Sequence, residues 1–421
     1  MNRTWFKESR HAWIGLGSLW VIGFIGALTR FIMAFFQTQI SDDLGIGRSF
    51  ISAAWSTNLL IAALCAPAGG WLADRYGPKK VMLISAILGV AGTGTVVLGG
   101  HEPIVFFVGY GVISGFVGLG SSTSYMFMFE WFKHHRAKAT ALLASASSVG
   151  LAVVTPVFVS WSWLTWRDAF AASFALGAAV TLPVIWLGIR HAQPARQPQP
   201  AQPGPPPEPA AADGGAPRAP VMPRSAVYAP LFVLIAFALF TCGFNMGTVE
   251  MNLVAIHQLA KVPPHTIALA MSLLGMMEIA GSLAFGYFLD RVDKLMLMTL
   301  LYGIRVLGFG VLFMHDGWSP LVFAAAFGIT YLSAVPGGLL IARERAQGQG
   351  KQTGFLLMFH QGGGILGALV AGILFDRYGD YQLLIGADVF ICVIAALGYA
   401  YLYATGRTRS IGRPREQTAA G

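Results

Sequence analysis

Long runs of apolar residues recur along the whole 421-residue chain, and short polar segments separate them. A membrane-spanning helix needs about 20 consecutive apolar residues, and each run reaches roughly that length. The first run is too long, and too continuous with the rest, to be a cleaved signal peptide. The pattern predicts twelve membrane helices, near residues 12–40, 48–73, 81–99, 104–132, 139–161, 168–190, 228–256, 265–289, 296–315, 319–342, 353–375 and 383–405.

The composition supports an all-α membrane protein. Only 11% of the residues are charged and 55% are hydrophobic, whereas a soluble protein has about 25% charged residues. The three cysteines, Cys65, Cys242 and Cys392, lie in apolar runs at unrelated spacings and predict neither a disulfide framework nor a metal site. The chain also has no Walker loop and no Ser/His/Asp constellation. We therefore expect no enzyme activity, no catalytic residue, no metal and no cofactor.

The formal net charge of +9 is distributed asymmetrically. With both termini placed in the cytoplasm, the inner segments hold 22 of the 28 Lys and Arg residues, and two more lie within predicted helices. This asymmetry follows the positive-inside rule, so the basic charge fixes orientation and needs no nucleic-acid partner. The four basic residues in outer loops are Arg48, Arg167, Lys261 and Arg377.

A Pro/Ala-rich segment at 192–223 has no apolar periodicity and is typical of a flexible linker. It divides the chain into two halves of six predicted helices each. The predicted organisation is an N-terminal bundle, a cytoplasmic linker, a C-terminal bundle and a cytoplasmic tail, at residues 1–191, 192–227, 228–406 and 407–421.

Short polar segments recur at equivalent places in the two halves. GGWLADRYGPKK (69–80) follows the second predicted helix, and FGYFLDRVDK (285–294) follows the eighth. FKHHRAKATA (132–141) and RERAQGQGKQTG (343–354) follow the fourth and the tenth. Two equivalent membrane halves are typical of transporters that rock around a central site.

The first of these segments resembles the loop signature of the major facilitator superfamily, G-x-L-a-D-r-x-G-r-r. The resemblance implies two pseudo-symmetric six-helix bundles, with the signature loops as gates at the inner face. A carboxylate beside basic residues forms a charge relay there, which can lock one conformation and release in the other. Alternatively, these charges only obey the positive-inside rule, although two copies at equivalent positions favour the gate. The matching residues are Gly70, Asp74, Arg75 and Gly77 with Lys79 and Lys80, and in the second copy Asp290 and Arg291.

Further segments resemble the monocarboxylate-transporter family, which is similar to the oxalate/formate antiporters. They are GYGVISGFVGLG (109–120), EWFKHHRAKATALLASASSVG (130–150), WRDAF (166–170) and DLGIGRSFISAAWS (43–56). The resemblance implies proton-coupled transport of a small organic anion. Two departures stand against a simple lactate-type clamp. His11-Ala12-Trp13 replaces the family's acidic-Gly start, and Ser282 stands where the family has a substrate-binding arginine, four residues after the acid that Glu278 matches.

Arg30 is the most informative charged residue within a predicted membrane helix. Such charges cost several kcal/mol at the bilayer centre and mark functional sites by default. The segment TRFIMAFF (29–36) resembles the family's first helix, where a lysine faces the pathway and Arg30 takes its place. Its guanidinium can hold a carboxylate through two parallel hydrogen bonds. Two interpretations stay open: Arg30 anchors the substrate, or it forms a structural ion pair with Glu250 or Glu278.

Other polar residues within predicted helices extend this candidate site. Desolvation disfavours the charged form of a carboxyl, and Glu278 matches the family's proton carrier, so we expect Glu278 to couple transport to protons. The alternative is that Glu278 is a buried carboxyl whose hydrogen bonds are satisfied within the protein. Glu250 and Asn245 lie on the seventh helix and His360 lies on the eleventh, and we expect all three to line the central pathway and bind substrate. Arg305 lies on the ninth helix, which is usually peripheral in this fold, and is expected to extend to the membrane interface.

These observations predict a monomeric, proton-coupled secondary transporter of a small organic anion in a bacterial inner membrane. The fifth helix lacks the G-x-x-x-G-P-x-x-G-G run of drug–proton antiporters, so an exporter of that type is disfavoured. Two alternatives remain. One is transport, inward or outward, of a zwitterion or larger polar metabolite such as an amino-acid-like compound or a siderophore. The other is a receptor-like protein that has the fold without transport.

Overall fold

The computed structural model describes residues 8–132, 136–189, 225–289, 291–345 and 350–405. Within these ranges it contains twelve helical spans that are long and apolar enough to cross a membrane. All twelve predicted spans are confirmed, with ends that differ from the predicted ones by a few residues. Asp290 lies outside the described residues, as do the termini and the whole Pro/Ala-rich segment at 192–223.

Nine of the spans are continuous α-helices, and three are built from several consecutive elements. The elements are α1 (Arg10–Leu44), α2 (Arg48–Tyr76), α3 (Pro78–Gly99), α4 (Pro103–Phe106), η2 (Phe107–Ile113), η3 (Ser114–Gly120), α5 (Thr123–Trp131), α6 (Arg136–Ser160), α7 (Trp166–Leu176), η4 (Gly177–Thr181), η5 (Val184–Gly188), α8 (Ser225–Leu259), α9 (Pro264–Leu289), α10 (Lys294–Met314), α11 (Ser319–Tyr331), α12 (Ala334–Arg345), α13 (Gly350–Tyr378) and α14 (Gln382–Ala404).

The fourth span changes its winding along its length, which the apolar pattern did not predict. It passes from α4 through the π-helical segment η2 and the 3₁₀ segment η3 into α5. The Ser114 hydroxyl donates a hydrogen bond of 3.0 Å to the Gly109 carbonyl within this irregular stretch. Departures from α-helical winding inside a helix commonly mark strain or function.

Local chemistry explains several helix ends. Ser9 caps the start of α1 by accepting from the Ala12 N–H, and Asp293 caps α10 in the same way. Thr165 and Asp168 form a capping box at the start of α7. Gly77 joins α2 to α3 with a φ of 93°, a backbone conformation that favours glycine.

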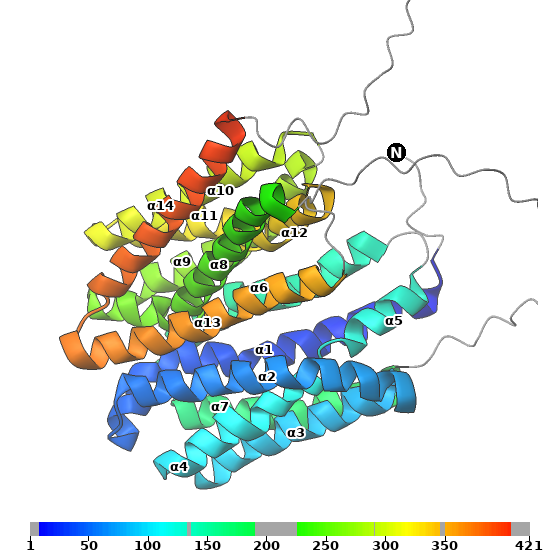
Figure 1. Cartoon of the computed structure of the whole chain (residues 1–421). Helices are drawn as coiled ribbons and strands as arrows, with labels where there is room; N and C mark the ends of the chain where they lie inside the picture. Colours follow the sequence, from blue (N-terminus) through cyan, green and yellow to red (C-terminus); the bar gives the residue numbers. More distant parts are fainter. Residues whose placement is uncertain (1–7, 133–135, 190–224, 290, 346–349, 406–421) are drawn as a thin grey trace, which may run out of the picture.

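The spans form an N-terminal half (α1 to η5) and a C-terminal half (α8 to α14), as Figure 1 shows. The C-terminal half buries its own apolar core, which includes Leu301, Phe323 and Cys392. The predicted start of the C-terminal bundle at residue 228 falls three residues inside α8, which begins at Ser225. The other predicted domain boundaries remain predictions.

Several hydrogen bonds join the two halves at one end of the bundle. We call the end where α1 begins and α2 ends the linker side, and the opposite end the far side. On the far side, the Gln37 amide donates to the Met251 carbonyl at 2.8 Å, and the Ser56 hydroxyl donates to the Ile365 carbonyl at 2.9 Å. Toward the linker side, α10 and α14 rise away from α1–α3 in Figure 1.

Candidate functional site

A cavity lies between the two halves near the middle of the bundle. It encloses about 700 Å³ of space, a volume that includes its open mouth. Four helices supply its charged and phenolic groups: Arg30 from α1, Glu250 from α8, Glu278 from α9 and Tyr331 from the end of α11. Most of the remaining wall is apolar or hydroxylic and includes Phe31, Trp55, Leu151, Met271, Leu274, Ser147, Ser148 and Thr155.

Arg30 forms an ion pair across the cavity. Its Nη1 lies 3.7 Å from Oε2 of Glu250, and the two side chains are 40% and 26% exposed. The Tyr331 hydroxyl donates a hydrogen bond to the other carboxylate oxygen of Glu250. The pair therefore joins the two halves, as one of the two sequence interpretations expected. The guanidinium is nevertheless accessible, and its fork of donors can accommodate a second anion.

Glu278 faces the same cavity from α9 and is almost fully buried, with 4% of its surface exposed. The Ser148 hydroxyl on α6 donates to Glu278 Oε2 at 2.6 Å, so this contact also joins the two halves. The backbones of α6 and α9 approach closely here: a Cβ on Gly275 would lie 2.4 Å from the Ser148 carbonyl oxygen. Glu278 is therefore held at the seam between the halves, on the opposite half from Arg30.

Arg305 does not extend to the membrane interface, and that prediction is wrong. Its side chain is fully buried inside the C-terminal half. The guanidinium donates to Oγ1 and the carbonyl oxygen of Thr330, at 3.3 and 3.1 Å, and to Asn245 Oδ1 at 3.2 Å. Asn245 in turn donates to Asp388 Oδ1 at 2.6 Å. The Asn245 amide thus links the Arg305 guanidinium to the Asp388 carboxyl group within an apolar core.

Asn245 and His360 lie away from the cavity lining. Asn245 is fully buried, and its amide is used by Arg305 and Asp388. His360 is partly buried, with Nδ1 3.2 Å from the Leu239 carbonyl oxygen. Their predicted contact with substrate has no support from this geometry. The reason is helical phase: α8 directs Glu250 to the cavity and Asn245 into the core of its own half.

The signature residues occupy the linker-side end of α2 and the loop after α9. Asp74 and Arg75 are exposed, and the Arg75 guanidinium lies 5.5 Å from the ring centres of both Trp71 and Tyr76. Arg291 stacks on the Tyr287 ring at 3.6 Å, and Asp290 lies outside the described residues. The gating role therefore stays a prediction.

Gly69, which directly precedes the signature glycine Gly70, brings two helices into close contact. A Cβ on Gly69 would lie 2.0 Å from the Leu119 carbonyl oxygen, so α2 and η3 touch through their backbones at Gly69. The nearest neighbour of a Cβ on Gly70 would be Ser122 Oγ at 3.7 Å, an ordinary contact distance. Gly69 rather than Gly70 therefore makes the backbone contact between α2 and η3.

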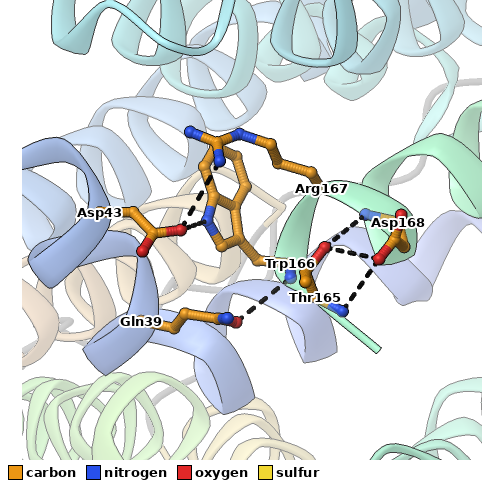
Figure 2. A network of polar contacts seen from close by, with 6 residues as sticks. All are labelled: Gln39, Asp43, Thr165, Trp166, Arg167 and Asp168. Atoms are coloured by element: carbon orange, nitrogen blue, oxygen red, sulfur yellow. Dashed lines mark hydrogen bonds and ion pairs between the residues drawn. The ribbon is translucent and has the colours of Figure 1, made fainter. Parts of the chain in front are cut away.

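The Trp166-Arg167 corner fixes α7 to α1 on the far side. The Asp43 carboxylate accepts a hydrogen bond from the Trp166 indole N–H at 2.7 Å and forms an ion pair with the Arg167 guanidinium at 3.7 Å (Figure 2). The Gln39 side chain accepts from the Trp166 backbone N–H at 3.3 Å. This network lies within the N-terminal half and stabilises the corner between two helices.

Sequence reasoning missed Tyr331 and Ser148, which contact the two cavity carboxylates. Neither residue type is unusual in a membrane helix, so no local signal distinguishes them. Over the described residues, His, Cys, Asp and Glu side chains form no group of three that could hold a metal ion.

Comparison with known proteins agrees with this architecture. A family model described as the Major Facilitator Superfamily matches residues 19–315 and 251–421. The Bacillus subtilis MFS-type transporter YcxA is 26% identical over 385 residues, which cover 86% of this chain and 88% of that protein. Mouse monocarboxylate transporter 11 is 24% identical and covers 85% of this chain and 79% of its own length.

Solved structures show the same fold. The nucleoside transporter NupG superposes with a TM-score of 0.69 at 15% identity, covering 94% of this chain and 99% of its own. The family match spans both halves of the chain, in agreement with the twelve helical spans. The protein is a multi-pass membrane protein and belongs to the major facilitator superfamily.

Proposed function

We propose that this protein is a secondary transporter of a small organic monoanion and that Arg30 binds the anionic group. The observation that carries this proposal is a partly exposed arginine in a cavity between the two halves. Arginine presents planar, paired donors that match a carboxylate. The apolar surface of Phe31, Trp55 and Leu151 suits the body of such a molecule.

The relatives support the same substrate class. A monocarboxylate transporter covers 85% of this chain at 24% identity. The low identity, and the serine at position 282 in place of the family's arginine, argue that this chain binds the substrate carboxylate with different residues. Arg30 would act without a second arginine from α9, and the hydroxyls of Ser147 and Thr155 are available in the wall to orient the rest of the substrate.

Glu250 would act as the resident counter-ion of Arg30. An unpaired guanidinium in a closed, poorly solvated cavity would be costly. Glu250 pairs with Arg30 in the structure and meets that need. A bound carboxylate would compete for the same guanidinium, and the Tyr331 hydroxyl would keep a hydrogen bond to the displaced Glu250.

Glu278 would carry the coupling proton. It is buried at the seam between the halves and its partner Ser148 belongs to the other half. A negative Glu278 accepts from the Ser148 hydroxyl, whereas a protonated Glu278 has no remaining charge to bury when the cavity closes. Protonation would therefore ease the passage between conformations.

Transport would proceed by alternating access in a bacterial inner membrane, with both termini in the cytoplasm and the protein acting as a monomer. In this orientation the linker side is cytoplasmic, and the far-side contacts hold the outer side closed. The Asp74–Arg75 loop and its second copy at Asp290 and Arg291 would gate the inner side.

A second candidate is a zwitterionic or larger polar metabolite. The observation that favours it is the presence of two carboxylates, Glu250 and Glu278, beside one cation in the same cavity. If Glu278 stays ionised, it can bind a substrate ammonium while Arg30 binds the carboxylate. The two candidates therefore differ in the charge state of Glu278 during transport.

Uptake into proteoliposomes tests the proposal. The panel comprises lactate, benzoate, alanine and glycine betaine, each with and without an inward proton gradient. We expect uptake of a monocarboxylate, enhanced by the gradient. Gradient-independent uptake of the zwitterions, with no monocarboxylate uptake, would support the second candidate. No flux of any organic anion or zwitterion through a folded protein would contradict both.

Glu278→Gln is expected to uncouple transport from protons. Glutamine keeps an oxygen that accepts from Ser148, but it cannot bind and release a proton. With an inward gradient of one pH unit, one-proton symport can concentrate substrate about 10-fold, and the variant should not concentrate it at all. Exchange of labelled for unlabelled substrate should persist.

The matched control is Glu344→Gln, because Glu344 is an exposed carboxylate paired with Lys294 at 3.1 Å, outside the cavity. This control should accumulate substrate like the parent. Full gradient-driven accumulation by Glu278→Gln would show that another group carries the proton.

A further inference from the structure

The tetrapeptide Asp-Arg-Tyr-Gly occurs twice, at residues 74–77 and 376–379. The first copy ends α2 on the linker side, and the second ends α13 on the far side. The second copy is outside the signature segments and is not needed by the cavity. Its aspartate, Asp376, lies at a contact between the two halves.

Asp376 caps the start of α2 from the other half of the molecule. Its Oδ1 accepts from the Arg48 backbone N–H at 2.8 Å, and its Oδ2 accepts from the Ser49 backbone N–H at 2.9 Å. The first N–H groups of a helix have no partner within the helix. The residue in the N-cap position is Gly47, which has no side chain to supply one. A carboxylate there also interacts favourably with the helix dipole.

The surroundings fit this cap closely. A Cβ on Gly47 would lie 2.4 Å from Asp376 Oδ2, so only glycine leaves room for the carboxylate. The Arg48 side chain extends over the ring of Phe375, the neighbour of Asp376, at 4.9 Å from its centre. Its Nη2 donates to Thr38 Oγ1 at 2.9 Å. The end of α13 thus packs against the start of α2 through the Asp376 cap and the Arg48–Phe375 cation–π contact. The absence of a side chain at Gly47 makes room for the carboxylate.

We propose that the Asp376 cap on α2 is a far-side latch, which is formed only while the far side of the cavity is closed. Both hydrogen bonds join the two halves, and separating the halves there must break them together. The exposed Asp376 carboxylate can then be hydrated, whereas the α2 N–H groups lose their cap. The latch therefore sets the ratio of far-open to far-closed molecules. It rests on alternating access in the proposed function but not on the identity of the substrate.

The variants that test the latch differ in what they remove. Asp376→Ala removes both acceptors, and Asp376→Asn leaves one acceptor without the charge. Gly47→Ala keeps the carboxylate but places a methyl group against it, at a φ of −69° that alanine tolerates. The matched control is Asp380→Asn, because Asp380 is an exposed far-side aspartate that caps only Gln382 of its own half.

The readout is the rate at which a polar maleimide labels a thiol introduced beneath the latch. Ser56→Cys, in a background with Cys65→Ser, places this thiol on α2 at a buried contact with Ile365 of the other half. Its labelling rate follows the far-open population when opening is fast. Cys392, fully buried within the C-terminal core, reports general unfolding in the same molecule.

We expect Asp376→Ala and Gly47→Ala to raise the labelling rate of the thiol at position 56 about fivefold, as loss of a helix cap implies. Asp376→Asn should raise it less, and Asp380→Asn should leave it unchanged. Labelling of Cys392 should stay constant in all four. Equal labelling rates at position 56 in all variants would overturn the latch, and so would a parallel rise at Cys392. Because no substrate is added, failure of the latch is distinguishable from failure of the proposed anion transport.

Discussion

Arg30→Gln is expected to reduce transport, measured as kcat/KM for uptake into proteoliposomes, by about 100-fold. A hydrogen bond to a charged group contributes about 1.5–3 kcal/mol, and each 1.4 kcal/mol is a factor of ten. Glutamine can donate one hydrogen bond to a carboxylate but offers neither a positive charge nor a paired set of donors. The protein should still insert and fold, because the Arg30–Glu250 pair is partly exposed and contributes little to stability.

Two further variants separate binding from structural pairing. Arg30→Lys keeps the charge without the planar fork and should retain part of the activity. The double variant Arg30→Gln with Glu250→Gln removes both charges, so it should fold normally and still fail to transport. Normal uptake by Arg30→Gln or by the double variant would show that Arg30 is only a structural partner of Glu250. Arg377→Gln, at an exposed far-side arginine, is the control.

Arg305→Met is expected to destabilise the protein by about 3–5 kcal/mol, the cost of removing one partner from a buried pair of charges. Methionine fills much of the same space, so the loss comes from electrostatics and hydrogen bonding rather than from a large cavity. Asp388 would stay buried without its compensating cation, and the carbonyl oxygens of Thr330 and Tyr331 would each lose a donor. A lower midpoint of thermal unfolding in detergent measures the effect.

Adding Asp388→Asn to this variant tests the mechanism. Asparagine removes the uncompensated charge and can still bond to Asn245, so the double variant should regain part of the lost stability. Purely additive destabilisation would show that Arg305 and Asp388 do not interact through Asn245. Arg377→Met should have little effect, because Arg377 is exposed.

The helices were predictable because a bilayer sets one dominant physical requirement. A span must be apolar over about 20 residues and must satisfy its own backbone, so hydropathy alone locates it. The changed winding of the fourth span was not predictable, since its apolar run looks the same whether the backbone is α, π or 3₁₀ helical. Hydropathy depends on the polarity of the side chains and does not depend on whether backbone hydrogen bonds span three, four or five residues.

The cavity was predictable only in part. Arg30 and Glu278 stood out because a charge in a membrane helix is rare and must face a protein partner or water. The same reasoning misplaced Arg305, whose compensating groups come from distant parts of the sequence: Asn245 is 60 residues before it, and Thr330 is 25 residues after it. One sequence shows that a charge must be compensated but not which residue compensates it.

The far-side contact involves a tetrapeptide that occurs twice in the sequence. Asp-Arg-Tyr-Gly at 376–379 repeats the tetrapeptide at 74–77, although the two copies end helices on opposite sides of the bundle. The two copies do not occupy equivalent positions in the two halves, since residues 69–80 correspond to residues 285–294. The repeat therefore becomes meaningful only when α2 and α13 are seen side by side.

The uneven winding of the fourth span affects how scanning experiments on it should be read. Successive side chains of an α-helix advance by about 100°, whereas the advance is smaller in a π-helix and about 120° in a 3₁₀ helix. From Phe107 to Gly120 the rotation per residue therefore changes along the chain. Reagent accessibility measured position by position should lose its 3.6-residue period there and regain it from Thr123 onward. Faces drawn on a helical wheel through this span would assign lipid-facing and pathway-facing residues to the wrong sides.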